Sequence, residues 1–217
     1  YLAGATPVRA EANGLALETA LRLESAAPQR ISLLLGYDDV ASIQYFGHLQ
    51  KAWYARNGKT FIAALEETWT CRDTLLADCD AFDKELLKEA KERGGEDYTL
   101  IVSAAYRQAI AAHKLIADPQ GKPVFLSKEN DSNGCIGTVD VSYPSIPLFL
   151  KYNPELVRAM ARPVLHFASL PVWTYDFAPH DVGRYPYATG QVYARMQREP
   201  WAAQDLGQRF SNGDVMP

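Results

Sequence analysis

The sequence predicts a mainly α-helical chain of antiparallel helical hairpins, preceded by a short β segment. Three observations support this fold class. After residue 37, apolar residues recur at steps of three and four over long stretches. These stretches follow one another without the alternation of strands and helices that builds a parallel sheet. Residues 1–36 instead alternate partly with a period of two, which is typical of strands.

The N-terminal segment predicts a pair of strands. Residues 14–23 alternate only partly between apolar and polar side chains, and residues 30–35 form a second apolar run after a turn at Pro28. Two strands alone are marginally stable in water, so they need a larger sheet. We therefore expect residues 1–36 to be the end of an upstream β domain, and residues 37–217 to be the first part of a helical domain.

Helices account for most of the remaining sequence. They are expected over about 38–57, 61–94, 98–116 and 153–168, with a further helix start after Pro144. Gly94-Gly95 separates the second helix from the third, because glycine favours helix ends. Asn153-Pro154-Glu155 opens the fourth, since a capping Asn, a Pro at the first position and an acidic residue coincide there.

Composition argues against several classes of function. The net charge of −4 and the absence of clustered Lys and Arg disfavour nucleic-acid binding. No apolar run approaches the roughly 20 residues of a membrane span. Zinc-protease, esterase, phosphate-loop and dinucleotide motifs are absent, and the three cysteines lack zinc-site spacing. We expect neither a metal nor a cofactor.

Polar residues gather in two loops, 127–140 and 179–191. The first contains Glu129, Asp131 and Asp140. Hydrolysis of an amide or glycosidic bond needs an acid and a base, and a carboxylate pair in a cleft can supply both. The alternative is that Asp131 and Asp140 only stabilise local turns.

The second loop joins ionisable and aromatic side chains. His180 and Asp181 are adjacent, and such a pair can move a proton or orient water. Arg184 could hold an anion. Tyr185 and Trp173 offer flat faces to a sugar ring or an apolar ligand, or else they pack this loop against the helix ends.

At these loops the sequence resembles the glutaminase A family of large secreted or periplasmic proteins. The resemblance extends from about Tyr37 to Gly190 and rests on motifs that follow one another along the chain. They are Tyr37-Asp38-Asp39, Tyr106-Arg107-Gln108, Ala112-His113-Lys114, Phe125-Leu126-Ser127-Lys128-Glu129-Asn130, Ser132-Asn133-Gly134, Thr138-Val139-Asp140-Val141, Tyr143-Pro144-Ser145, Tyr152-Asn153-Pro154-Glu155-Leu156, His180-Asp181-Val182-Gly183 and Tyr185-Pro186.

This resemblance implies a fold and an activity. The fold would be the end of a β-sandwich followed by part of an α/α toroid of the six-hairpin glycosidase type, whose remaining hairpins would complete the cleft. The activity would be hydrolysis of glutamine, or another small amide, to ammonia and acid. A glycoside hydrolase using a carboxylate pair, and a non-catalytic protein that binds a glycan or peptide, are the alternatives. The location would be secreted or periplasmic.

The resemblance also implies a set of site residues. They are Lys128, Glu129, Asn130, Asp140, Tyr143, His180 and Asp181. One carboxylate of the first loop, Glu129 or Asp140, would be the general base. His180 or Asp181 would donate the proton or orient the substrate, and the side chains of residues 128 and 130 would donate hydrogen bonds to a developing oxyanion.

Overall fold

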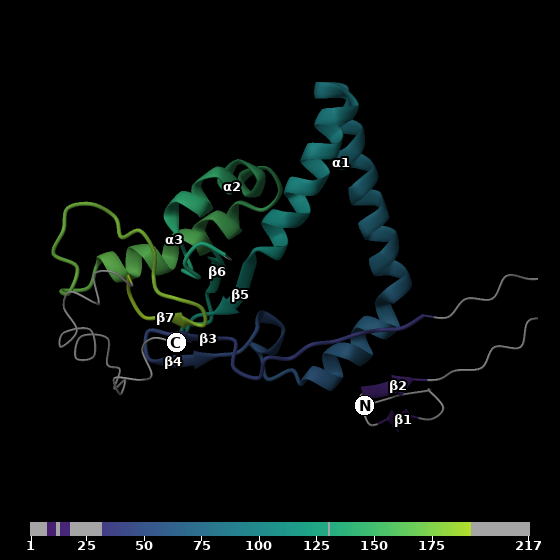
Figure 1. Ribbon diagram of the computed structural model, residues 1–217, viewed down its shortest axis with the longest axis horizontal. Helices are drawn as coiled ribbons and strands as arrows, with labels where there is room; N and C mark the ends of the chain where they lie inside the picture. Colours follow the sequence, from purple (N-terminus) through teal and green to yellow (C-terminus); the bar gives the residue numbers. More distant parts are fainter. Residues whose placement is uncertain (1–7, 12–13, 18–31, 130, 192–217) are drawn as a thin grey trace, which may run out of the picture.

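The computed structural model confirms a mainly helical chain with short strands (Figure 1). It describes residues 8–11, 14–17, 32–129 and 131–191. The helices are α1 (Phe61–Ala111), α2 (Val139–Tyr152) and α3 (Pro154–Ala168). The strands are β1 (Val8–Glu11), β2 (Gly14–Leu17), β3 (Ile43–Tyr45), β4 (His48–Gln50), β5 (His113–Ala117), β6 (Pro123–Ser127) and β7 (Tyr187–Ala188), with a 3-10 turn at Trp53–Ala55.

Strands are present near the N-terminus, but one expected pairing is wrong. The structure pairs β2 with β1 in an antiparallel hairpin, in which Glu11 lies opposite Gly14. Residues 32–35 are not in a strand, and residues 18–31 lie outside the described part of the chain. A strand adjacent in sequence is the easier partner, because closing a short loop costs less conformational entropy than closing a long one.

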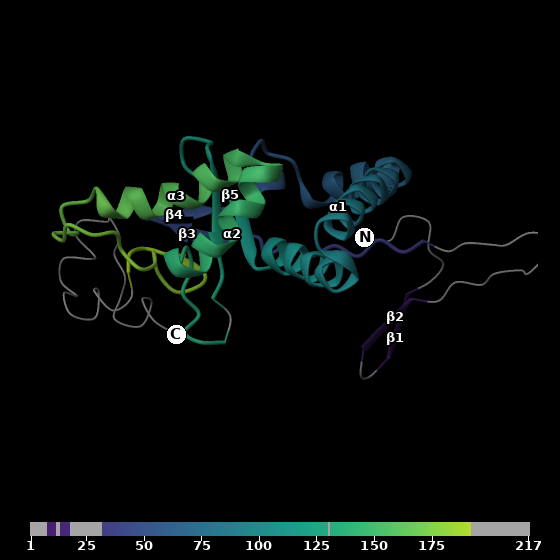
Figure 2. The same cartoon turned by 90° about the horizontal axis from the view of Figure 1, so that it is seen from above.

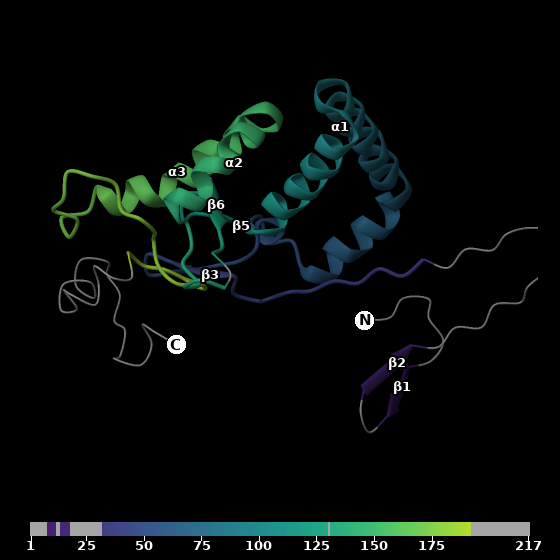
Figure 3. The ribbon, with the colours of Figure 1, turned by 45° about the horizontal axis from the view of Figure 1, so that its top comes forward.

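The long element α1 is itself a helical hairpin. Gly95 has a φ of 78°, so the helix breaks there, as the sequence predicts. Figures 1 and 3 show two arms that meet at a common tip. The side-chain hydroxyl of Thr60 accepts a hydrogen bond from the backbone N–H of Ala63 and caps the first arm. The arms contact through Phe82 and Tyr106, whose ring centroids are 5.1 Å apart.

The expected helix over 98–116 ends early. Its last helical residue is Ala111, and β5 follows and pairs antiparallel with β6. Ile116 and Val124 face each other across this pair, and both are fully buried. Burial of a strand pair in the core therefore outweighs the helical spacing of the apolar residues.

The expected helix over 38–57 is wrong. Its residues form β3 and β4, which are joined through Phe46 and Gly47, with φ of 40° and 90°. β3 also pairs in parallel with β7. Figure 2 shows the segment after α3 returning to this sheet. Pairing with β7, which lies far along the chain, thus outweighs the helical spacing of the apolar residues in this segment.

Helices α2 and α3 form a second hairpin. α3 begins at Pro154 with Glu155 in its first turn, as predicted, although the Asn153 side chain makes no capping hydrogen bond. α2 begins at Val139, earlier than the expected start after Pro144. α3 packs against α2 and β6, and its Phe167 is fully buried in the main core cluster. This core supports the loops on either side of the hairpin.

Candidate functional site

The two polar loops singled out from the sequence lie side by side. The Ile136 N–H donates to the Gly183 carbonyl at 2.8 Å, and the Val182 N–H returns a bond to the Ile136 carbonyl at 3.0 Å. The Val139 N–H also donates to the His180 carbonyl at 2.8 Å. The start of α2 is therefore attached directly to the loop that carries the histidine.

Two glycines permit this close approach. Gly183 has a φ of 137°, and a Cβ there would lie 2.0 Å from the Tyr187 carbonyl oxygen. Gly137 has a φ of 63°, and its Cβ would lie 2.8 Å from Val182 Cγ2. Residues that carry a Cβ rarely adopt such backbone angles, so glycine is required in both of the contacting loops.

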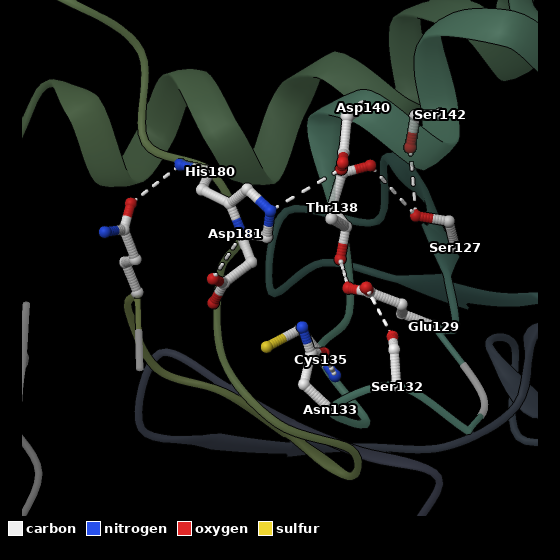
Figure 4. A network of polar contacts seen from close by, with 11 residues as sticks. Ser127, Glu129, Ser132, Asn133, Cys135, Thr138, Asp140, Ser142, His180 and Asp181 are labelled. Carbon is white, nitrogen blue, oxygen red and sulfur yellow. Dashed lines mark hydrogen bonds and ion pairs between the residues drawn. The ribbon is translucent and has the colours of Figure 1, made fainter. Parts of the chain in front are cut away.

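His180 lies between two carboxylates (Figure 4). Its Nδ1 is 3.0 Å from Asp181 Oδ2, and its Nε2 is 3.6 Å from Asp140 Oδ1. Asp181 is fully buried, whereas the Asp140 side chain is 70% exposed in the first turn of α2. One carboxylate thus holds the imidazole from inside, and the other meets it at the surface.

The surroundings of His180 favour its protonated form. The hydrogen bond with Asp181 raises the pKa of His180; burial opposes this rise, and the charges of Asp140 and Glu129 add to it. Asp181 is itself fixed, because its Oδ1 accepts a hydrogen bond from the Gly183 N–H at 2.9 Å. Nδ1–H bonded to Asp181 leaves Nε2 as the atom that faces Asp140.

Glu129 is held differently from Asp140. Its two carboxylate oxygens accept hydrogen bonds from Ser132 at 2.6 Å and from Thr138 at 3.2 Å. The bond from Ser132 has the largest effect and lowers the pKa of Glu129, burial opposes it, and the bond from Thr138 supports it. Glu129 is therefore a stable anion close to the histidine.

Burial raises the pKa of the neighbouring Cys135 thiol to about 12, so this thiol stays protonated.

Four predicted binding residues are described on the two polar loops and on α2. The ammonium of Lys128 lies 5.9 Å from the ring centroid of Tyr185, and Tyr143 on α2 is 74% exposed. Arg184 is partly buried beside Gly134, and its Nε is a buried atom with no hydrogen-bond partner among the described residues. Asn130, also predicted to bind substrate, lies outside the described residues.

Trp173 lies elsewhere, in the core. It is 7% exposed, its ring centroid is 5.5 Å from that of Phe167, and its indole N–H donates to the Phe177 carbonyl at 2.7 Å. This placement agrees with the alternative that the loop aromatics pack the loop against a helix. We therefore leave Trp173 out of the candidate site.

Several site residues carry no obvious signal in the sequence. Ser132 and Thr138 hold Glu129, and the Gln191 side chain accepts a hydrogen bond from the His180 backbone N–H at 2.7 Å. Ser, Thr and Gln occur throughout polar loops, so residue type alone does not single them out. For Ser132 and Thr138, the position between Glu129 and Asp140 in the sequence is the available hint.

Two wider features complete the description of the site. Within the described residues, no group of three or more His, Cys, Asp and Glu side chains is arranged to hold a metal ion. In the same part of the chain, every helix is too short or too polar to cross a membrane.

The described chain is thus a helical-hairpin protein. Its candidate site lies on loops and places a histidine between two carboxylates. Residues 95–204 match the family of the glutaminase A six helical-hairpin domain, and the chain belongs to this family. The match includes α2, α3 and both polar loops.

Two curated relatives are similar to the chain. Glutaminase A of Aspergillus oryzae is 38% identical over 119 residues, which are 54% of this chain and 17% of the relative. A probable glutaminase of Arthroderma benhamiae is 30% identical over 110 residues, which are 50% of this chain and 13% of the relative. The chain thus matches less than a fifth of the length of either relative. No solved structure matches it.

Proposed function

We propose that His180, Asp181, Asp140 and Glu129, here called the His180 group, hydrolyse a small primary amide to ammonia and the acid. Glutamine is the first candidate for this amide. The observation that carries this proposal is the position of His180, which is held by buried Asp181 while its Nε2 faces exposed Asp140. The names of the two curated relatives support glutamine as the substrate to test.

In the proposed reaction, water attacks the carbonyl carbon of the amide. Asp140 accepts a proton from this water as the new C–O bond forms. The C–N bond then breaks, and protonated His180 donates a proton from Nε2 to the departing nitrogen, which leaves as ammonia. The raised pKa of His180 maintains the imidazolium needed for this step.

The contacts of Glu129 favour Asp140 as the base. Both Glu129 oxygens accept hydrogen bonds, and its pKa is lowered, so this carboxylate binds a proton weakly. We assign Glu129 to the stabilisation of the His180 imidazolium through its charge. Lys128 and Arg184 carry positive charges near this group and would bind the carbonyl oxygen or a substrate carboxylate.

We further propose that other hairpins complete the cleft. The described residues contain two helical hairpins, namely α1 and the pair α2 and α3, whereas the family is named for six. The much greater length of the curated relatives supports this view. Residues 1–36 would then belong to a preceding β domain, and the protein would be secreted or periplasmic.

The test is ammonia release from glutamine, measured for the protein, three variants of the site and one control variant. His180→Gln and Asp140→Asn should each lower kcat/KM at least about 100-fold. Glu129→Gln should have a smaller effect, mainly through the pKa of His180. Asp73→Asn is the matched control, because Asp73 is an exposed carboxylate on α1.

Two results would contradict the proposal. Full activity in Asp140→Asn would remove Asp140 as the base. Release of reducing sugar from a glycan panel, with no ammonia from glutamine, would replace amide hydrolysis by glycoside hydrolysis.

A further inference from the structure

A cavity lies where the β3–β4 turn and the β5–β6 turn meet helix α3. It has a volume of about 310 Å³, at the lower end of the range for small-molecule sites. It is lined by Tyr45, Phe46, His48, Asp118, Pro119, Gln120, Lys122, Arg162 and His166. None of these residues belongs to the His180 group, so the cavity has no part in the proposed hydrolysis.

Tyr45 supplies a polar group that lacks a partner. The residue is 6% exposed, and no described residue forms a hydrogen bond with its hydroxyl. Burial raises the pKa of Tyr45, the charge of Asp118 raises it further, and the charge of Arg162 lowers it. This hydroxyl therefore lies near charges of both signs. The hydroxyl is not among the fully buried polar atoms that lack a hydrogen bond, and it can donate one to a ligand in the cavity.

Asp118 provides a fixed negative charge. Its Oδ1 accepts hydrogen bonds from the backbone N–H groups of Gln120 and Lys122, at 2.9 and 2.8 Å. These bonds stabilise the turn between β5 and β6. Within the described chain, its second oxygen Oδ2 makes no hydrogen bond or ion pair with a side chain, so this oxygen can accept bonds from a cationic ligand group.

Positive charge lines the same cavity. Lys122 is exposed, and its ammonium forms no ion pair with any described residue. Arg162 is already neutralised, because its guanidinium bonds the Glu155 carboxylate and the Pro123 carbonyl. Among the acidic, lysine and arginine side chains of the lining, Lys122 and Asp118 are therefore left for a ligand, and the Tyr45 hydroxyl lies in the same lining.

Aromatic groups close one side of the cavity. The imidazole of His166 makes an edge contact with Phe46, with ring centroids 4.6 Å apart, and stacks with Tyr45 at 6.4 Å. Burial lowers the pKa of His166, and the charge of Asp118 partly offsets this effect. The imidazole and the two rings offer flat faces to a short aliphatic chain.

We propose that this cavity binds a small zwitterion with a carboxylate and an ammonium group, the chemistry of a free α-amino acid. The ammonium group pairs with Asp118 Oδ2. The carboxylate accepts hydrogen bonds from Lys122 and from the Tyr45 hydroxyl, and the aliphatic part lies against the aromatic wall. A simple anion would leave Asp118 facing it with a like charge, and a simple cation would face Lys122.

Binding can be measured by NMR on the full chain, from the signals of its four histidine side chains. His48 and His166 report on the cavity, whereas His113 and His180 lie outside it. The probes are norvaline, pentanoate and butylamine, which carry both charged groups, the carboxylate alone and the ammonium alone. Signals are assigned with single His→Gln variants.

Norvaline should shift the signals of His48 and His166 in a saturable manner. Pentanoate and butylamine should each bind about tenfold more weakly. Asp118→Asn, Lys122→Gln and Tyr45→Phe should each weaken norvaline binding several-fold. Asp118→Asn keeps the oxygen that stabilises the turn, and Tyr45→Phe removes only the hydroxyl. Lys88→Gln, an exposed lysine of α1, is the control that should change nothing.

Each other outcome would overturn the proposal. If pentanoate bound as tightly as norvaline, the cavity would be an anion site. If norvaline failed to shift His48 and His166, or bound Asp118→Asn and Lys122→Gln as well as the parent, the cavity would have no such ligand. A shift of His180 alone would place norvaline at the proposed hydrolytic site. Ammonia release tests that other site, so the two proposals can fail separately.

Discussion

Asp181 places its carboxylate 3.0 Å from the Nδ1 of its neighbour His180, although Asp181 is fully buried and the His180 side chain is 42% exposed. A buried carboxylate with this partner and a backbone N–H is held in one orientation. The imidazole consequently has a fixed inner nitrogen and an outer nitrogen that faces Asp140. The following predictions test this arrangement and the contacts that support it.

The titration of His180 should be displaced upwards. Its pKa is raised in the folded protein, chiefly by Asp181, so its imidazole signals should titrate above the usual value of about 6.5. A raised folded-state pKa stabilises the protein fully below the unfolded-state pKa, and this contribution is lost as pH rises through the folded-state pKa. His180→Gln should remove this part of the pH dependence of unfolding, measured in urea. If the pH dependence of unfolding were the same in His180→Gln as in the parent, the predicted stabilisation by His180 would be wrong.

Asp181→Asn should reduce activity strongly while the fold persists. The amide is isosteric but cannot stabilise the imidazolium, and it can reverse which nitrogen of His180 carries the proton. We expect a loss of about 10³-fold in ammonia release and a lower pKa of His180. Asp131→Asn, on an exposed residue of the first polar loop, is the control. Equal activity of the two variants would disprove the role of Asp181.

Gly183→Ala should destabilise the protein by about 2 kcal/mol or more, because it combines an unfavourable φ with a clash against the Tyr187 carbonyl. Gly58→Ala is a matched control, since Gly58 has a φ of 79° but no atom within 4 Å of the added Cβ. This control should cost about 1 kcal/mol. Thermal unfolding of both variants separates the clash from the backbone strain. Equal losses would show that the loop adapts to the added methyl group.

Lys114→Met should destabilise the protein because it leaves Asp39 without its ion-pair partner. Both side chains are largely buried, with 21% and 12% exposure. Burial raises the pKa of Asp39, but hydrogen bonds from Lys114 and Ser42 lower it overall. We expect a loss of about 1–2 kcal/mol in urea unfolding. The double variant with Asp39→Asn should recover part of this lost unfolding free energy. If the losses of the two single variants simply added in the double variant, Lys114 and Asp39 would not be coupled.

The helices were predictable where local signals agree. In α1 the apolar spacing and Gly95 indicate two helical arms, and Pro154 marks the start of α3. The segment 38–57 was not predictable in this way, because Ile43 and Phe46 are spaced as in a helix but are buried against β7. A single sequence does not reveal a strand partner that follows much later in the chain.

The sequence singles out the ionisable residues of the candidate site but not their geometry. The adjacency of His180 and Asp181 marks them as a pair, and Glu129 and Asp140 stand out as carboxylates in a polar loop. Their different surroundings depend on the backbone, which gives Glu129 two hydroxyl donors and leaves Asp140 exposed. For Trp173 the sequence leaves binding and packing open, since an aromatic residue in a polar loop can belong to the core, where the structure places it.

The hydrogen bonds that join Ile136 to Val182 and Gly183 also bear on the order of folding. The arms of α1 meet through a turn between neighbouring residues, so this hairpin can form rapidly from local contacts. The His180 group forms only when the loop after α3 returns to the start of α2, which requires closure of a much longer loop. Helical content should therefore recover before the proposed ammonia release during refolding, and that release would report on the last stage of assembly.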